Sequence, residues 1–169
     1  FLSVVFIAAV FLRIINLTAT NLNADSLLFE DAALYWAIAN SSDTFWGVAK
    51  YVFLEQTERA PGYLIFLTAI VNIFGAQFLP VLLIQCLIDS LTCLIIMALG
   101  QTIFSKHYWI FGFLAAVWPN LILHSGLILT DCLFLFFFSG FLLSFTNLLK
   151  KQTIKAAILT GVLLGLATL

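Results

Sequence analysis

Acidic side chains are few in this chain, and most of them gather in one segment. Of the 8 acidic residues, six fall between residues 25 and 58: Asp25, Glu30, Asp31, Asp43, Glu55 and Glu58. Glu30 and Asp31 are adjacent and begin a segment with the spacing of an amphipathic helix. Such carboxylates can act as a general base or bind a metal ion. They can also cap the helix, and from the sequence alone we favour capping, because acids at a helix N-terminus gain about 0.3–1 kcal/mol from the helix dipole.

A second charged pair, Glu58 and Arg59, stands just before Pro61, which opens an apolar segment. The guanidinium of Arg59 offers a planar set of donors for a phosphate or pyrophosphate. A helix that begins at Pro61 adds the positive end of its dipole. These features suit an anionic lipid headgroup at the membrane surface, although a solvated ion pair at a helix start explains the same residues equally well.

A third candidate, Asp131, stands at the start of a long apolar run. An acid at the mouth of a spanning helix is costly unless it is solvated or paired. Asp131 therefore either caps the helix together with Thr130 or joins the other carboxylates in one outer cavity. His124 lies nearby in the sequence and is either a metal ligand or an interfacial side chain, and we favour the second.

Asp89 lies in the middle of an apolar run, with Gln85 and Thr92 on the same helical face. An acid inside the membrane is a candidate functional residue. We favour a polar packing patch, in which Asp89 meets Arg13 or a helix outside this chain. The cysteines stand in apolar stretches without a CxxC pattern, so we expect buried reduced thiols at Cys86, Cys93 and Cys132.

Composition decides what kind of fold must position these residues. The chain has 169 residues, of which 63% are hydrophobic and 9% are charged, whereas soluble domains are about 45–50% apolar and about 25% charged. This excludes a soluble enzyme, a disordered region and a disulfide scaffold, and the net charge of −1 excludes a basic nucleic-acid surface. Continuous apolar runs exclude a β-barrel. The sequence predicts an all-α, polytopic helical membrane protein.

The predicted organisation is one transmembrane domain with a long outer loop. Residues 18–76 form this loop, with interfacial amphipathic helices at 30–40 and 44–54. Residues 61–75 are too few for a crossing, which needs about 17–25 apolar residues, so we expect a half-inserted or interfacial helix. The chain starts at Phe1 and ends in an apolar run, so we expect a piece of a longer protein. Spanning helices are predicted at 1–17, 78–103, 109–123, 131–149 and 156–169.

Basic residues after the apolar runs set the predicted orientation. Cytoplasmic loops of membrane proteins carry an excess of Lys and Arg. The loop at 124–130 and the acidic segment then lie outside, provided that 61–75 does not cross the membrane. The residues placed on the cytoplasmic side are Lys106, His107, Lys150, Lys151 and Lys155.

Four segments, in this order, resemble a known superfamily. They are DAALYWAIA from Asp31, ERAPGYLIFLTAIVNIFG from Glu58, PNLILHSGLILTDCLFLFF from Pro119, and GVLLGLATL at 161–169. Their order and spacing are similar to those of membrane glycosyltransferases of the GT-C fold, in particular the protein O-mannosyltransferase and aminoarabinose-transferase-like group. One departure is that many members have Asp-Glu where this chain has Asp31-Ala32, with Glu30 before instead.

The resemblance implies an enzyme that moves a sugar from a polyprenyl phosphate to an acceptor hydroxyl, with inversion, at the extracytoplasmic face of a bacterial inner membrane. It implies that Asp31 is the catalytic carboxylate and that Asp131 is a second acid of the cavity. Glu58 matches an acid that can bind a metal, and the acids could act with or without a divalent cation. The residues assigned to substrate binding are Glu30, Tyr35, Arg59 and Tyr63. The implied partners are the lipid-linked sugar and membrane lipids, with no nucleic acid.

Two other kinds of protein fit parts of the pattern. A secondary transporter or channel subunit would use Asp89 and Asp131 in an ion path, although transporters usually show inverted repeats and acids at the membrane midplane. A structural membrane subunit would need no acids gathered on one face. Placement of Asp31 and Asp131 on opposite faces of the membrane would favour these alternatives.

Overall fold

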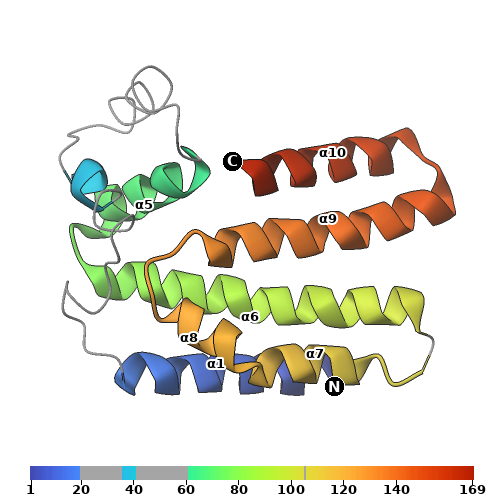
Figure 1. Cartoon of the computed structure of the whole chain (residues 1–169), viewed down its shortest axis with the longest axis horizontal. Coiled ribbons are helices and arrows are strands. Elements are labelled where there is room, and N and C mark those ends of the chain that lie inside the picture. The colour runs from blue at the N-terminus through green and yellow to red at the C-terminus, as the bar shows by residue number, and fades with distance from the viewer. Residues whose placement is uncertain (20–35, 41–60, 105) are drawn as a thin grey trace.

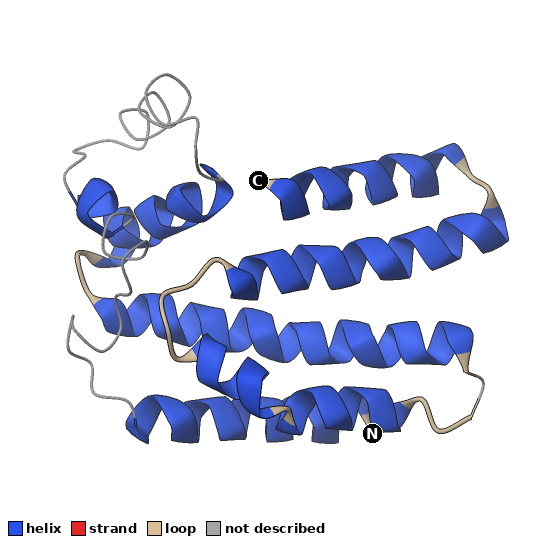
Figure 2. Ribbon diagram, viewed as in Figure 1, coloured by secondary structure: helices blue, strands red, loops and turns tan. Residues whose placement is uncertain are grey.

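The computed structural model describes residues 1–19, 36–40, 61–104 and 106–169, and all regular structure in these ranges is helical (Figure 2). This confirms the predicted all-α membrane fold. Within these ranges, three helices are long and apolar enough to cross a membrane: α1 (Leu2–Ala19), α6 (Phe78–Ile103) and α9 (Asp131–Lys151). The shorter labelled helices are α5 (Pro61–Phe74), α7 (Trp109–Val117), α8 (Pro119–Ser125) and α10 (Ile154–Thr168), and residues 36–40 are helical as well.

The long helix α6 is the centre of the bundle. It packs against α1 and α7 on one side and against α9 on the other, and α10 packs on the outer side of α9 (Figure 1). One buried cluster joins α1 to α6 and α7 through Val5, Ala9, Cys93, Met97 and Ala116. All three cysteines are buried and free, as predicted.

The segment expected to be one spanning helix at 109–123 is instead two short helices, and this prediction is corrected. Trp118 lies between α7 and α8 with extended backbone angles, φ −66° and ψ 118°. Pro119 causes the break, because proline has no N–H to donate and its ring disfavours a helical conformation in the residue before it.

The segment between α1 and α6 begins and ends at the same end of the bundle. Helix α1 ends at the same end of the bundle at which α6 begins, so the chain between them returns to the end that it left (Figure 1). Helix α5 lies at this end too, followed by a turn at Gly75, whose φ is +80°. Leu17, Leu64, Leu67, Leu82 and Ile128 form a second buried cluster that holds α5 against the ends of α1 and α6. The opposite end holds the C-terminal ends of α6 and α9, and hence the basic residues that end α9 or come soon after α6 and α9.

Candidate functional site

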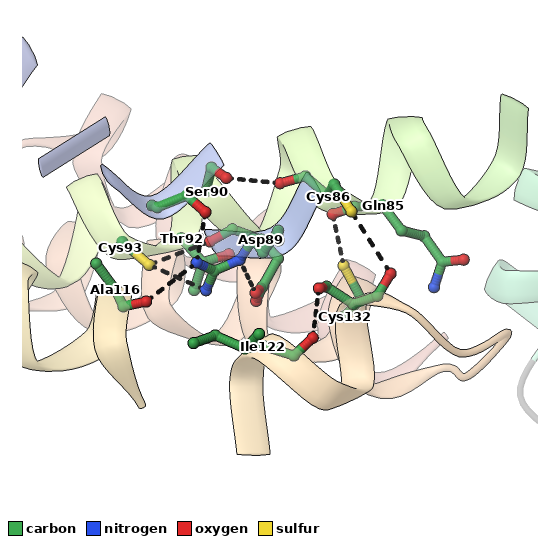
Figure 3. A network of polar contacts seen from close by, with 12 residues as sticks. Gln85, Cys86, Asp89, Ser90, Thr92, Cys93, Ala116, Ile122 and Cys132 are labelled. Atoms are coloured by element: carbon green, nitrogen blue, oxygen red, sulfur yellow. Dashed lines mark hydrogen bonds and ion pairs between the residues drawn. The ribbon is translucent and has the colours of Figure 1, made fainter. Parts of the chain in front are cut away.

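Asp89 is bound to Arg13 in the interior of the bundle. Arg13 Nε donates to Asp89 Oδ2 at 2.5 Å, and the two side chains are 0% and 3% exposed. The rest of the guanidinium is also used, because Nη1 donates to the carbonyl oxygens of Ala9 and Ala116 and Nη2 to Cys93 Sγ (Figure 3). A buried charge pair is tolerated when its hydrogen bonds are satisfied in this way. The expected packing patch with Arg13 is confirmed.

The polar face of α1 also supports the break between α7 and α8. Carbonyl groups at the end of a helix lack intrahelical partners. Arg13 Nη1 donates to Ala116 O at 3.4 Å, and Asn16 Nδ2 donates to Ile122 O at 2.9 Å. Arg13 and Asn16 are three residues apart and lie on one face of α1. This face therefore satisfies carbonyls on both sides of Pro119.

The loop between α8 and α9 is tied to α6. Gln85 Nε2 donates to the carbonyl oxygens of Leu127 and Leu129 at 3.2 and 3.3 Å. Cys86 Sγ contacts Ser125 O at 3.7 Å, and Cys132 Sγ donates to Gln85 O at 3.3 Å (Figure 3). These contacts fix the segment that leads into Asp131.

Asp131 is the first residue of α9 and is half exposed. Its Oδ2 lies 3.6 Å from His124 Nδ1 at the end of α8, and the two side chains are 49% and 43% exposed. Asp131 also lines an apolar cavity of about 410 Å³. The cavity lies between the start of α5, the start of α9 and the end of α10. Its lining residues are Gly62, Tyr63, Ile65, Phe66, Thr130, Asp131, Leu133, Phe134, Phe137, Leu166, Ala167 and Leu169.

This cavity brings together three of the four segments that carry the family resemblance. Tyr63 belongs to the segment that begins at Glu58, and Asp131 belongs to the segment that begins at Pro119. Leu166 belongs to the segment at 161–169. These segments are far apart in the sequence, yet their residues line one cavity. Two predicted site residues, Tyr63 and Asp131, therefore share a location.

The other predicted site residues lie outside the described part of the chain: Glu30, Asp31, Tyr35, Glu58 and Arg59. Among the described residues, no group of three or more His, Cys, Asp or Glu side chains could hold a metal ion. The metal expectation rests on Glu58, and nothing in the described residues tests it.

The sequence analysis did not predict that Asn16 supports the break between α7 and α8. It also did not predict that Gln85 holds the loop between α8 and α9. A signal was present, because each is a polar residue in an apolar run on the same helical face as Arg13 or Asp89. The contact of His124 with Asp131 was also missed. It depends on the turn at 126–130, which brings the end of α8 back to the start of α9.

Apolar helices around an apolar cavity with a carboxylate in its lining are suited to a membrane glycosyltransferase that uses a lipid-linked donor. The comparison with family sequences is more specific, since the dolichyl-phosphate-mannose-protein mannosyltransferase family matches residues 58–169, more than half of the chain. The chain belongs to this family, which supports a glycosyltransferase that takes its sugar from a polyprenyl phosphate. No curated protein and no solved structure matches the chain.

Proposed function

We propose that this chain is part of an inverting glycosyltransferase that acts at the extracytoplasmic face of a bacterial inner membrane. The single observation that carries the proposal is the cavity that three family segments line, with Asp131 among its residues. Its volume of about 410 Å³ falls within the usual range for ligand pockets, about 300–1,000 Å³. Its aromatic and aliphatic lining suits the isoprenoid chain of the donor.

The proposed chemistry needs few groups, because phosphate is already a good leaving group. Asp31 accepts the proton of the acceptor hydroxyl, whose oxygen attacks the anomeric carbon on the side opposite the phosphate. The bond to the phosphate oxygen breaks, and polyprenyl phosphate leaves with the bonding electrons. Arg59 binds the phosphate, and Asp131 with Tyr63 orients the substrates at the cavity. Positioning and charge stabilisation then lower the barrier.

Glu58 is proposed as a ligand of a divalent cation, and no step of the reaction is assigned to that ion. The acceptor is a hydroxyl of a protein, lipid or glycan. The extracytoplasmic location is supported by the basic residues that end α9 or come soon after α6 and α9, at the end of the bundle opposite the cavity.

The test measures transfer of labelled mannose from polyprenyl-phosphate mannose in membranes that contain the full chain. Replacement of a general base typically costs about 10²–10⁴-fold in rate, so Asp31→Asn is expected to lose at least 10²-fold, and Asp131→Asn to lose activity as well. Asp43→Asn, which removes another acid of the same loop without an assigned role, is the control. Wild-type rates for Asp31→Asn would contradict the proposed mechanism.

The transporter alternative has no observation in its favour. It assigned Asp89 to an ion path, but the Asp89 carboxylate is bound to Arg13 in the interior of the bundle. Family membership also supports a transferase.

A further inference from the structure

Gln85 lies one helical turn before Asp89 on α6, and its side chain is completely buried. Its Nε2 donates to Leu127 O and Leu129 O, and Ile128 between them is also completely buried. We propose that Gln85 is a positioning residue, which fixes the loop between α8 and α9 and thereby holds Asp131 at the apolar cavity. Its role in sugar transfer rests on the function proposed above.

The choice of glutamine follows from the shape of the loop. Leu129 N donates to Leu127 O at 3.0 Å, which makes a tight turn around Ile128. The carbonyl groups of 127 and 129 lie next to the interior of an apolar bundle, where buried backbone groups need partners. A side-chain amide carries two N–H donors on one nitrogen. One buried glutamine can therefore serve both carbonyls of the turn.

Gln85 is connected to Asp131 from both sides along the chain. Leu129 stands two residues before Asp131 and is held by the Gln85 side chain. Cys132 stands one residue after it, and its Sγ donates to the Gln85 backbone carbonyl at 3.3 Å. Thr130 O accepts from Phe134 N at 3.1 Å and so begins α9. A loop that moves away from Gln85 must therefore carry the Asp131 carboxylate with it.

The first measurement is hydrogen exchange of the backbone amides at 126–131 in the full chain, reconstituted in lipid nanodiscs. Gln85→Leu puts an apolar side chain of similar volume at this buried position and removes both donors. We expect exchange in this loop to quicken by about tenfold, as for the loss of a buried hydrogen bond. Ser90→Ala is the matched control, since Ser90 is buried on the same helix and donates only to Cys86 O within it. That variant should leave exchange at 126–131 unchanged.

The second measurement is mannose transfer from polyprenyl-phosphate mannose, expressed per folded molecule. We expect Gln85→Leu to lower kcat by about tenfold and to change KM for the donor by less than about twofold, because the cavity lining stays in place. If Gln85 acts through Asp131, adding Gln85→Leu to Asp131→Asn should have little further effect. If Gln85 instead has a merely structural role, the fold-losses in kcat of the two single variants should multiply in the double variant.

Unchanged exchange at 126–131 in Gln85→Leu would overturn the proposal, whatever happens to activity. Faster exchange together with multiplicative losses in the double variant would also overturn it, because Gln85 would then act independently of Asp131. If the wild-type chain transfers no mannose, the proposed function has failed in this form. The exchange result still decides whether Gln85 fixes the loop, so the two failures are distinguishable.

Discussion

At the scale of single residues, the ion pair of Arg13 and Asp89 is the contact whose loss we expect to cost most. Asp89→Leu leaves a guanidinium buried among α1, α6 and α7 without its carboxylate. Removing one partner of a buried pair typically costs about 3–5 kcal/mol. We expect a loss of this size in the free energy of unfolding, measured by denaturation in mixed detergent micelles.

The double variant Arg13→Leu with Asp89→Leu separates pairing from other effects. It removes both charges, and apolar residues often replace a buried pair at little cost. We therefore expect it to be more stable than Asp89→Leu alone. Thr92→Val is the control, since it removes a hydroxyl that donates to Ile88 O within the same helix. A double variant as unstable as the single one would show that the two charges do not depend on each other.

At the scale of elements, the contact between α6 and α7 depends on the absence of a side chain at Gly112. A Cβ at this position would lie 2.7 Å from Met97 Cβ and 3.3 Å from Cys93 O. Close helix packing of this kind is typical of small residues in membrane bundles. Gly112→Ala is expected to lower the free energy of unfolding by about 1–3 kcal/mol, as overpacking does.

Gly161 in α10 provides the matched control, since it is also a glycine inside a helix. A Cβ there would meet no atom of the described residues within 4 Å. Gly161→Ala should therefore leave stability unchanged or raise it by about 0.5–1 kcal/mol, because alanine favours the helix. A gain in stability for Gly112→Ala as large as that for Gly161→Ala would show that helix propensity rather than packing decides at Gly112.

The elements also show what sequence alone can predict. The long runs at 78–103 and 131–149 correspond closely to α6 and α9, because an apolar run of this length defines its own helix. The run at 109–123 was predicted wrongly as one helix. A proline inside a membrane helix often produces only a kink, if neighbours satisfy the freed backbone groups. Here the donors from α1 stabilise a complete break, and that contact is not visible in the local sequence.

The site was predictable only in part for the same reason. Arg13 stood out as a basic residue inside an apolar run, where an unpaired charge is costly, so it was one of the two partners expected for Asp89; the other was a helix outside this chain. Tyr63 and Asp131 were assigned by resemblance, and their common cavity forms only when the ends of α5, α9 and α10 meet. The spacing of residues within one segment does not predict which helix ends meet in the folded chain.

At the scale of the whole molecule, the ends at which the helices begin and end predict which residues lie on the same side of the membrane. Helices α6 and α9 begin at the same end of the bundle, so Ala76 just before α6 and Asp131 at the start of α9 lie on one side, and Gln152 between α9 and α10 lies on the other. The measurement is labelling of Ala76→Cys, Asp131→Cys and Gln152→Cys by an impermeant maleimide, in a chain whose native cysteines are replaced by alanine. We expect the first two positions to react in intact cells and the third only after the membrane is opened.

Asp31→Cys extends the same experiment to the acid on which the mechanism depends. If α5 does not cross the membrane, position 31 should react from the same side as position 131. A base and a second acid can act on one substrate only from the same face. Reaction of positions 31 and 131 from opposite faces would rule out a shared cavity, even if the helices fold as described. Reaction of position 152 from outside would leave the cavity intact and reverse the orientation, since the basic residues near it would then be extracytoplasmic. The labelling pattern thus separates an error in the site from an error in the direction of the bundle.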